Sequence, residues 1–304
     1  MIVGDLSPSE VARRLAGQGL VLQTGPFSFR IRSPLAPVAE GVAQLYAHYP
    51  LLPDEAFADF PVTVGAGPGL RRWLRPQARF RYDGREVFEP LPAAQAYPLL
   101  EWGMNWCISS QAHQYLILHA AVVERQGGAL ILPAPPGSGK STLCAALVHA
   151  GWRLLSDELT LIRAADGQVV PLCRPVSLKN ASIDVIRRFA PDARFNRVTR
   201  DTAKGAIAHM AVPAAQVTRA AEPARPAWLV FPRYQAGADT LLAPRNRAQS
   251  LVDLVRNAFN FAMHGDAGFE LAGNLVAGMR CLELSYSRLD EATAALAALA
   301  DTPA

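Results

Sequence analysis

Residues 129–143 of the chain are Ala-Leu-Ile-Leu-Pro-Ala-Pro-Pro-Gly-Ser-Gly-Lys-Ser-Thr-Leu, and this stretch decides the expected fold. The apolar run predicts a buried strand, the Gly/Pro segment predicts a turn, and Lys140 opens a helix expected to end at Gly151. A Gly-Lys-Ser-Thr sequence in this context is typical of a phosphate-binding P-loop. Ala134 stands where the first glycine of the pattern is expected, and we expect only a modest change in the path of the loop.

The chemistry of a P-loop explains why these residue types are needed. Successive backbone N–H groups at a helix N-terminus form an anion cradle, which bulky side chains at Gly137 and Gly139 would obstruct. Lys140 then reaches the β- and γ-phosphates, and the Ser141 hydroxyl becomes a ligand of Mg²⁺. The alternative is a strand-to-helix turn that binds no ligand. The expected nucleotide contacts are Pro136, Gly137, Ser138, Gly139, Lys140, Ser141 and Thr142.

Two adjacent acids, Asp157 and Glu158, follow the next expected strand, 17 residues after Lys140. A strand that returns after the P-loop helix ends at the same edge of the sheet as the loop, where a carboxylate can reach Mg²⁺ or a substrate hydroxyl. One acid can accept the proton of an attacking hydroxyl, while its neighbour coordinates the metal. The expected metal ligands are therefore Ser141, Asp157 and Glu158. The alternative is that the acids mark a solvated turn.

The segment after Glu158 distinguishes two kinds of small kinase. In metabolite kinases of the gluconate or shikimate type, the acids after the P-loop helix lead into another helix. Here residues 159–162 and 169–172 are apolar and β-branched and flank Asp166-Gly167, so they predict a hairpin. This favours a mixed sheet with antiparallel additions.

The pattern along the chain divides it near residue 95. Residues 1–94 predict a small α+β module, with a hairpin across Thr24-Gly25-Pro26, a helix over 38–49 and three short strands. Residues 95–304 predict an α/β domain that contains the P-loop. Its further expected elements are helices over 94–114, 180–189, 247–263, 268–276 and 289–299, strands over 115–123, 153–155, 227–231, 240–242 and 281–286, and a polar loop over 192–202.

Composition narrows the class of protein. Half of the 304 residues are hydrophobic and 18% are charged, which excludes a disordered, collagenous or coiled-coil chain. The net charge is +4 without a Lys/Arg block, so we expect neither a nucleic-acid nor a membrane partner. Four cysteines without paired spacing indicate a reducing compartment. With no leader-like start and no apolar run near 18 residues, we expect a cytoplasmic protein.

Residues 115–210 resemble the HPr kinase/phosphorylase superfamily and, within it, the group called HPr-kinase-related kinase A. The superfamily order of a His, a strand, a turn, a second strand and the P-loop is matched by His119 in Leu-His-Ala-Ala-Val-Val (118–123) and by residues 127–132. The run Arg-Leu-Leu-Ser-Asp-Glu (153–158) is similar to the family's Arg-Leu-Val-Ala-Asp-Asp, with Glu158 in place of the second Asp. Residues 174–180 and 204–209 are similar to segments of the related-kinase group.

The resemblance implies a P-loop kinase of the HPr kinase/PEP carboxykinase-like type, an α/β fold with a mixed sheet preceded by the small α+β module. By the same resemblance, Asp157 is the general base and His119 lies beside it and the transferred phosphate. Lys140 completes the catalytic set. Arg174, Lys179 and Lys204 are secondary contacts for nucleotide or substrate phosphate, since a cationic clamp stabilises a transferring group.

The function expected from the sequence is transfer of the γ-phosphate of ATP, with Mg²⁺, to a hydroxyl. The resemblance implies that the acceptor is a serine of a protein or peptide, and that the N-terminal module is a docking element or, in a homo-oligomer, the oligomerisation element. Two alternatives stay open. One is a regulatory module that binds nucleotide without transferring phosphate, and the other is a small-metabolite kinase, which predicts a helix directly after Glu158.

Overall fold

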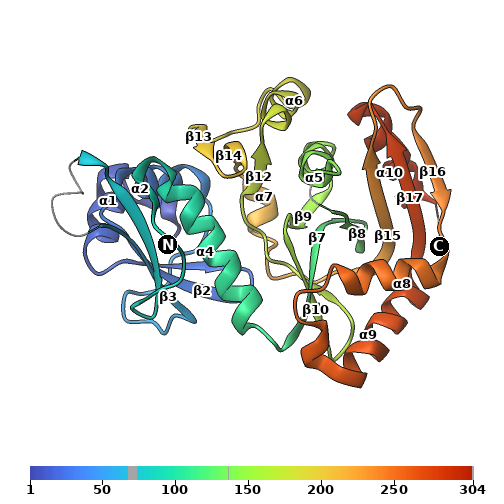
Figure 1. The fold of residues 1–304 in the computed structure, drawn as a ribbon, viewed down its shortest axis with the longest axis horizontal. Coiled ribbons are helices and arrows are strands. Elements are labelled where there is room, and N and C mark those ends of the chain that lie inside the picture. The colour runs from blue at the N-terminus through green and yellow to red at the C-terminus, as the bar shows by residue number, and fades with distance from the viewer. Residues whose placement is uncertain (68–73, 136, 303–304) are drawn as a thin grey trace. The chain divides into compact units, whose positions relative to one another are not determined.

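A computed structural model describes residues 1–67, 74–135 and 137–302 of the chain, and Figure 1 shows its ribbon. Helices and sheets alternate along the sequence, so the protein is α/β with mixed sheets. None of the helices in these residues is both long enough and apolar enough to cross a membrane. The chain divides into two compact units, the first made of Met1–Gln111, Ser177–Asn180 and Arg194–Thr218, the second of Ala112–Val176, Ala181–Ala193 and Arg219–Ala304.

The first unit is built on a six-stranded sheet in the order β1-β2-β3-β4-β5, with β6 paired to β4. The hairpin expected across Thr24-Gly25-Pro26 is confirmed as β1 and β2. Strands β2 and β3 are parallel, and α2 connects them. The elements are α1 (Pro8–Ala16), β1 (Leu20–Thr24), β2 (Phe27–Arg32), α2 (Ala36–Leu45), β3 (Phe60–Ala66), β4 (Gln77–Tyr82), β5 (Arg85–Glu86), β6 (Leu91–Pro92) and α4 (Ala96–Gln111).

Helix α4 belongs to the first unit, although its sequence led us to expect it at the start of the second region. Gly103 on α4 lies directly against the Phe80 ring of β4, and a Cβ at this position would collide with that ring. The Tyr97 hydroxyl donates a hydrogen bond to Glu101, which also accepts one from Tyr46 of the α2 segment (2.6 and 2.8 Å). These contacts join α4 to the first sheet.

A second small sheet completes the first unit, in the order β12-β14-β13. The expectation of a loop over 192–202 is wrong at its end, because Thr199–Thr202 forms β13. Thr199 pairs with Ile207 of β14, and this pairing satisfies backbone groups that a free loop would leave to solvent. The strands are β12 (Val176–Lys179), β13 (Thr199–Thr202) and β14 (Gly205–Met210), followed by the short helix α7 (Ala214–Val217).

The second unit contains an eight-stranded mixed sheet in the order β11-β10-β7-β8-β15-β17-β16, with β9 also paired to β7. Strands β8, β15 and β17 are parallel, while β7 is antiparallel to β8, β9 and β10. The strands are β7 (Tyr115–Arg125), β8 (Gly128–Pro133), β9 (Arg153–Ser156), β10 (Leu159–Arg163), β11 (Val169–Val170), β15 (Arg225–Tyr234), β16 (Leu241–Pro244) and β17 (Arg280–Tyr286).

Helices α8 and α9 share an apolar cluster with strand β7 of this sheet. Leu116, Leu118, Ala120 and Val122 alternate along β7 and share one apolar cluster with residues of α8 and α9, such as Leu254. In Figure 1 these two helices lie side by side, and α10 runs along β17, in agreement with their packing. The helices are α5 (Lys140–His149), α6 (Ala181–Phe189), α8 (Arg247–Arg256), α9 (Gly265–Gly278) and α10 (Leu289–Asp301).

One expected helix, over 247–263, is interrupted. Helix α8 ends at Arg256, and the 3-10 turn Phe261–His264 follows only after a short non-helical segment, residues 257–260. In that segment the Asn257 carbonyl accepts a hydrogen bond from the His119 N–H, and the Phe259 N–H donates to the Ile117 carbonyl (2.6 and 2.9 Å). The segment therefore pairs with the part of β7 that β8 leaves uncovered, and this pairing replaces the helical hydrogen bonds.

Candidate functional site

The loop between β8 and α5 is the centre of the candidate site. Strand β8 is buried along its whole length and ends at Pro133, and α5 begins at Lys140, so the predicted strand, turn and helix are confirmed. The Ser138 N–H donates to the Pro135 carbonyl (3.3 Å), which closes a turn inside the loop. Pro136, one of the expected nucleotide contacts, lies outside the described residues.

The two glycines of the loop have the same backbone conformation and different surroundings. Gly137 and Gly139 have φ angles of +88° and +89°, a region that favours glycine. A Cβ at Gly137 would meet no atom within 4 Å, so the space beside it is open. A Cβ at Gly139 would lie 2.7 Å from the Tyr286 hydroxyl oxygen and 3.2 Å from the Tyr234 Cβ. The loop is thus open at Gly137 and tightly packed at Gly139.

Two tyrosines that the sequence did not single out hold this packed side of the loop. The Tyr234 N–H donates to the Ser138 carbonyl (3.2 Å), and the Tyr286 hydroxyl donates to the Gly139 carbonyl (3.4 Å). Their rings meet edge to face with centroids 5.8 Å apart. Burial, and then Tyr234 beside it, raises the pKa of Tyr286, which keeps its hydroxyl protonated as a donor. In the sequence, Tyr286 ends the expected strand over 281–286, whereas Tyr234 lies beyond the expected strand over 227–231.

The first turn of α5 carries Lys140, Ser141 and Thr142. Lys140 is buried, with 8% of its surface exposed, whereas the two hydroxyl residues are half-buried. Free N–H groups at a helix N-terminus and a lysine there both attract anions. The turn can therefore bind phosphate oxygens with backbone donors, a charged amine and two hydroxyl groups.

Strand register places the acidic pair across β7 from this loop. On one side of β7, Ala120 pairs with Pro133, the last residue of β8. On the other side of β7, Val122 pairs with Ser156 and His119 pairs with Leu159. Asp157 and Glu158 therefore lie opposite Ala120 and Ala121 of β7. The backbone at Asp157 and Glu158 is therefore two strand spacings, about 10 Å, from the end of β8.

The charges of Asp157 and Lys140 both influence the thiol of Cys144 on α5. This thiol is fully buried, and burial is the largest cause that raises its pKa well above the ordinary value. The Asp157 carboxylate raises the pKa further, Lys140 lowers it, and Cys173 raises it. Asp157 is itself buried, with 6% exposed, while Glu158 is half-buried.

His119 lies beside the acidic turn on β7. It pairs with Leu159, the residue after Glu158, and its ring is 5.6 Å from the Phe259 ring, centroid to centroid. Its side chain is half-buried. Because β8 ends opposite Ala120, His119 is the first residue of β7 beyond the start of the loop. The structure thus brings the expected catalytic positions Lys140, Asp157 and His119 into one region of the second unit.

The three secondary cations fall in different places. Arg174 is buried in the second unit, next to Cys173 and two residues after Leu172, whose N–H donates to the Leu155 carbonyl of β9 (2.8 Å). Arg174 therefore follows a segment that runs beside the strand leading to Asp157. Lys179 ends β12 in the first unit, and Lys204 lies in the β13–β14 turn of that unit, with its amine 5.5 Å from the Trp102 ring centroid.

A cavity of about 660 Å³ opens at the beginning of the loop, within the second unit. Its volume lies in the range of ligand-sized pockets. The Arg245 guanidinium stacks on the Phe231 ring at 3.7 Å and pairs with Asp253. The lining includes loop residues Ala134, Pro135 and Ser138, strand residues Phe231, Arg233, Glu283 and Ser285, and Asp253, Arg256 and Asn257 from α8 and the residue after it.

The described residues contain no group of three or more His, Cys, Asp or Glu side chains arranged to hold a metal ion. Mg²⁺ in phosphate-transferring sites is commonly bound by one or two protein oxygens together with substrate phosphates and water. Ser141 on α5 and Asp157 at the end of β9 are oxygen donors of this kind. The donor set therefore fits a metal that arrives with a nucleotide.

Comparisons with known proteins find a family model and solved structures that are similar to this chain. A family model described as SynChlorMet cassette protein ScmC matches residues 102–172, which are 71 of the 304 residues. This segment includes the loop between β8 and α5 and the turn that carries Asp157 and Glu158. No curated protein matches the chain.

Among solved structures, the HPr(Ser) kinase/phosphatase from Coxiella burnetii is similar to 60% of this chain and 96% of its own, at 13% identity. The TM-score is 0.28.

Proposed function

We propose that the protein is an ATP- and Mg²⁺-dependent phosphotransferase that transfers the γ-phosphate to a hydroxyl, the serine hydroxyl of a protein or peptide. The observation that carries this proposal is the strand register that brings the loop before Lys140 and the turn at Asp157 to the same end of the sheet. Lys140 comes from the first turn of α5, and Asp157 comes from the end of β9. A phosphate-binding turn that faces a buried carboxylate has the two parts that phosphoryl transfer to a hydroxyl requires.

The loop suits the phosphates of ATP on local grounds. The space beside Gly137 is open, and packing by Tyr234 and Tyr286 holds the other end of the loop in one shape. Backbone donors fixed in this way need little reorganisation when an anion binds. Lys140 would contact the β- and γ-phosphate oxygens. Mg²⁺, when bound, would neutralise phosphate charge, with Ser141 and one acid of the 157–158 pair as protein ligands.

Asp157 would act as the general base. In the step proposed, the acceptor oxygen forms a bond to the γ-phosphorus while its proton passes to the Asp157 carboxylate. The bond from the γ-phosphorus to the β–γ bridging oxygen breaks, and ADP leaves with that oxygen. His119, beside the acidic turn, would contact the transferred phosphate. Most of the rate enhancement in such reactions comes from positioning and charge neutralisation.

The segment after Glu158 bears on the metabolite-kinase alternative. It continues as β10 and turns back as β11, with Leu161 paired to Val170. The helix that this alternative predicts is therefore not formed. The serine acceptor is proposed from the sequence resemblance of residues 115–210.

The test is incubation of the protein with γ-labelled ATP, Mg²⁺ and a library of serine-containing peptides and small carrier proteins. We expect labelled product with the wild-type chain, and its loss in Asp157→Asn with ATP binding retained. Asp166→Asn serves as the matched control, because Asp166 lies at the tip of the same hairpin in an exposed ion pair with Arg163 (2.6 Å). Its activity should stay within twofold of wild type.

Lys140→Ala separates the proposal from its alternatives. ATP binding should fall strongly in this variant, and unchanged binding would contradict the assignment of the loop. Transfer that survives Asp157→Asn would contradict the role of the base. ATP binding with no transfer to any acceptor, together with an effect of ATP on partner affinity, would support a nucleotide-dependent binding module and refute the kinase.

A further inference from the structure

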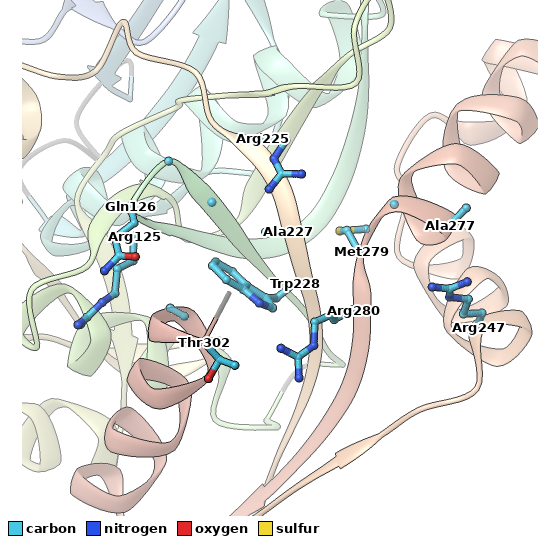
Figure 2. A pocket seen from close by; sticks show the side chains of 14 residues that line it. Arg125, Gln126, Arg225, Ala227, Trp228, Arg247, Ala277, Met279, Arg280 and Thr302 are labelled. Atoms are coloured by element: carbon cyan, nitrogen blue, oxygen red, sulfur yellow. The ribbon is translucent and has the colours of Figure 1, made fainter. Parts of the chain in front are cut away.

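A second cavity, of about 500 Å³, lies in the second unit at the end of the sheet away from the P-loop. Gly128, the first residue of β8, lines it, whereas the loop follows the last residue of β8. Figure 2 shows its lining. The lining residues come from the β7–β8 turn, the beginnings of β15, β17 and α8, and the ends of α9 and α10.

The lining carries positive charge without acidic side chains. Its charged residues are Arg125, Arg225, Arg247 and Arg280. Arg125 pairs with Asp301 at 3.0 Å. Among the described residues, the other three make no ion pair with an acid. Guanidinium groups that share a cavity repel one another, and an anion bound between them relieves that repulsion.

Trp228 also lines this cavity. Figure 2 shows the guanidinium groups of Arg225 and Arg280 on opposite sides of the Trp228 ring in that view, with Arg247 farther away beyond Met279. Trp228 is 7% exposed and packs edge to face on Trp152, with centroids 6.2 Å apart. A Cβ at Gly128 would lie 2.7 Å from the Trp228 ring, so the glycine is what allows the ring to occupy this position.

We propose that this cavity binds a small oxyanion, a molecule that carries phosphate or carboxylate groups, between Arg225 and Arg280. Guanidinium groups match both kinds of oxyanion through paired N–H donors. The small exposed part of Trp228 would contact the apolar part of the ligand. The site is independent of the proposed phosphotransferase function, because it shares no residue with the P-loop or the acidic turn.

The experiment is calorimetric titration of the full chain at low salt with two probes, inorganic pyrophosphate for phosphate and citrate for carboxylate. We expect at least one probe to bind, and the double variant Arg225→Gln/Arg280→Gln to weaken that binding about tenfold or more, since two charge-assisted contacts are removed. The matched control is Arg187→Gln/Arg188→Gln, which removes two positive charges from exposed positions on α6. Its affinity should stay within twofold of wild type.

Lys140→Ala distinguishes this site from the P-loop, which also attracts pyrophosphate. Binding that is retained in Lys140→Ala and lost in the Arg225/Arg280 variant supports the proposal, whether or not the chain transfers phosphate. Binding that is lost in Lys140→Ala and unchanged in the Arg225/Arg280 variant overturns it. So does the absence of binding by both probes, or an equal loss in the α6 control.

Discussion

Replacing Gly139 by alanine tests the shape of the P-loop quantitatively. The residue has a φ of +89°, and the left-handed region costs an alanine about 1–2 kcal/mol. The new Cβ would also lie 2.7 Å from the Tyr286 hydroxyl oxygen, in a packed region. Overpacking of this kind costs a further 1–3 kcal/mol, roughly. We therefore expect Gly139→Ala to lower the free energy of unfolding by about 2–5 kcal/mol.

Gly137→Ala is the matched control, because Gly137 has nearly the same φ, +88°, and no atom within 4 Å of the added methyl group. Gly137→Ala should lower the free energy of unfolding only by the cost of the left-handed backbone conformation, about 1–2 kcal/mol. The difference between the two variants then isolates the contact with Tyr286. The methyl group of Gly137→Ala projects into the open space beside the loop, so this variant should also weaken ATP binding.

The assay is unfolding in urea, monitored by tryptophan fluorescence. Midpoints are compared between variants whose unfolding free energy depends on urea concentration with the same slope. Tyr286→Phe in the Gly139→Ala background removes the hydroxyl that the methyl group meets and should restore part of the loss. Equal losses in the Gly137 and Gly139 variants would show that the tyrosines do not hold the loop as described. No recovery with Tyr286→Phe would lead to the same conclusion.

Three further outcomes follow from other contacts. Arg153→Met should lower the free energy of unfolding by about 3–5 kcal/mol, because it removes the guanidinium that lies 2.6 Å from the buried Glu124 carboxylate. The control Arg288→Met, at an exposed ion pair, should lower it by less than about 1 kcal/mol. Equal unfolding midpoints of the two variants in urea would contradict this prediction. Burial opposes ionisation of Glu124, but hydrogen bonds from Arg153 and from a backbone N–H outweigh burial and lower the pKa of Glu124. The ionised carboxylate therefore stabilises the folded chain above pH 4.5, and the free energy of unfolding should fall as the pH drops below 4.5. Glu124→Gln should flatten this part of the pH profile. Because burial, and then Asp157, raise the pKa of Cys144, its thiol should not react with a thiol reagent at pH 8 until the chain unfolds, and rapid labelling of the folded protein would contradict its placement.

The sequence predicted those elements whose local pattern is strong. The P-loop strand and helix, the hairpin after Glu158 and the hairpin at the start of the first unit all appear near their expected boundaries. Each combines an apolar period with turn residues, which are local signals. The helix α1 was missed, although Ser7 accepts a hydrogen bond from the Glu10 N–H and Pro8 follows it, an N-terminal signal that is visible in the sequence.

Other features depend on partners that are distant in sequence. The helix expected over 247–263 is interrupted because residues after Arg256 pair with the free edge of β7, and nothing within the helix pattern indicates that edge. The tyrosines that pack against the loop come from two strands more than ninety residues after it. Their role depends on strand order and register, which a single sequence does not specify.

The position of the candidate site follows from strand direction. Strands β8, β15 and β17 are parallel, so the loop, Tyr234 and Tyr286 meet at one edge of the sheet. Strand β7 is antiparallel to both β8 and β9, which makes β9 run in the direction of β8 and brings Asp157 to the same edge. A helix in place of β10 would remove the register with β7 that fixes where the acidic turn lies. The pairing of β10 with β7 therefore helps to position Asp157.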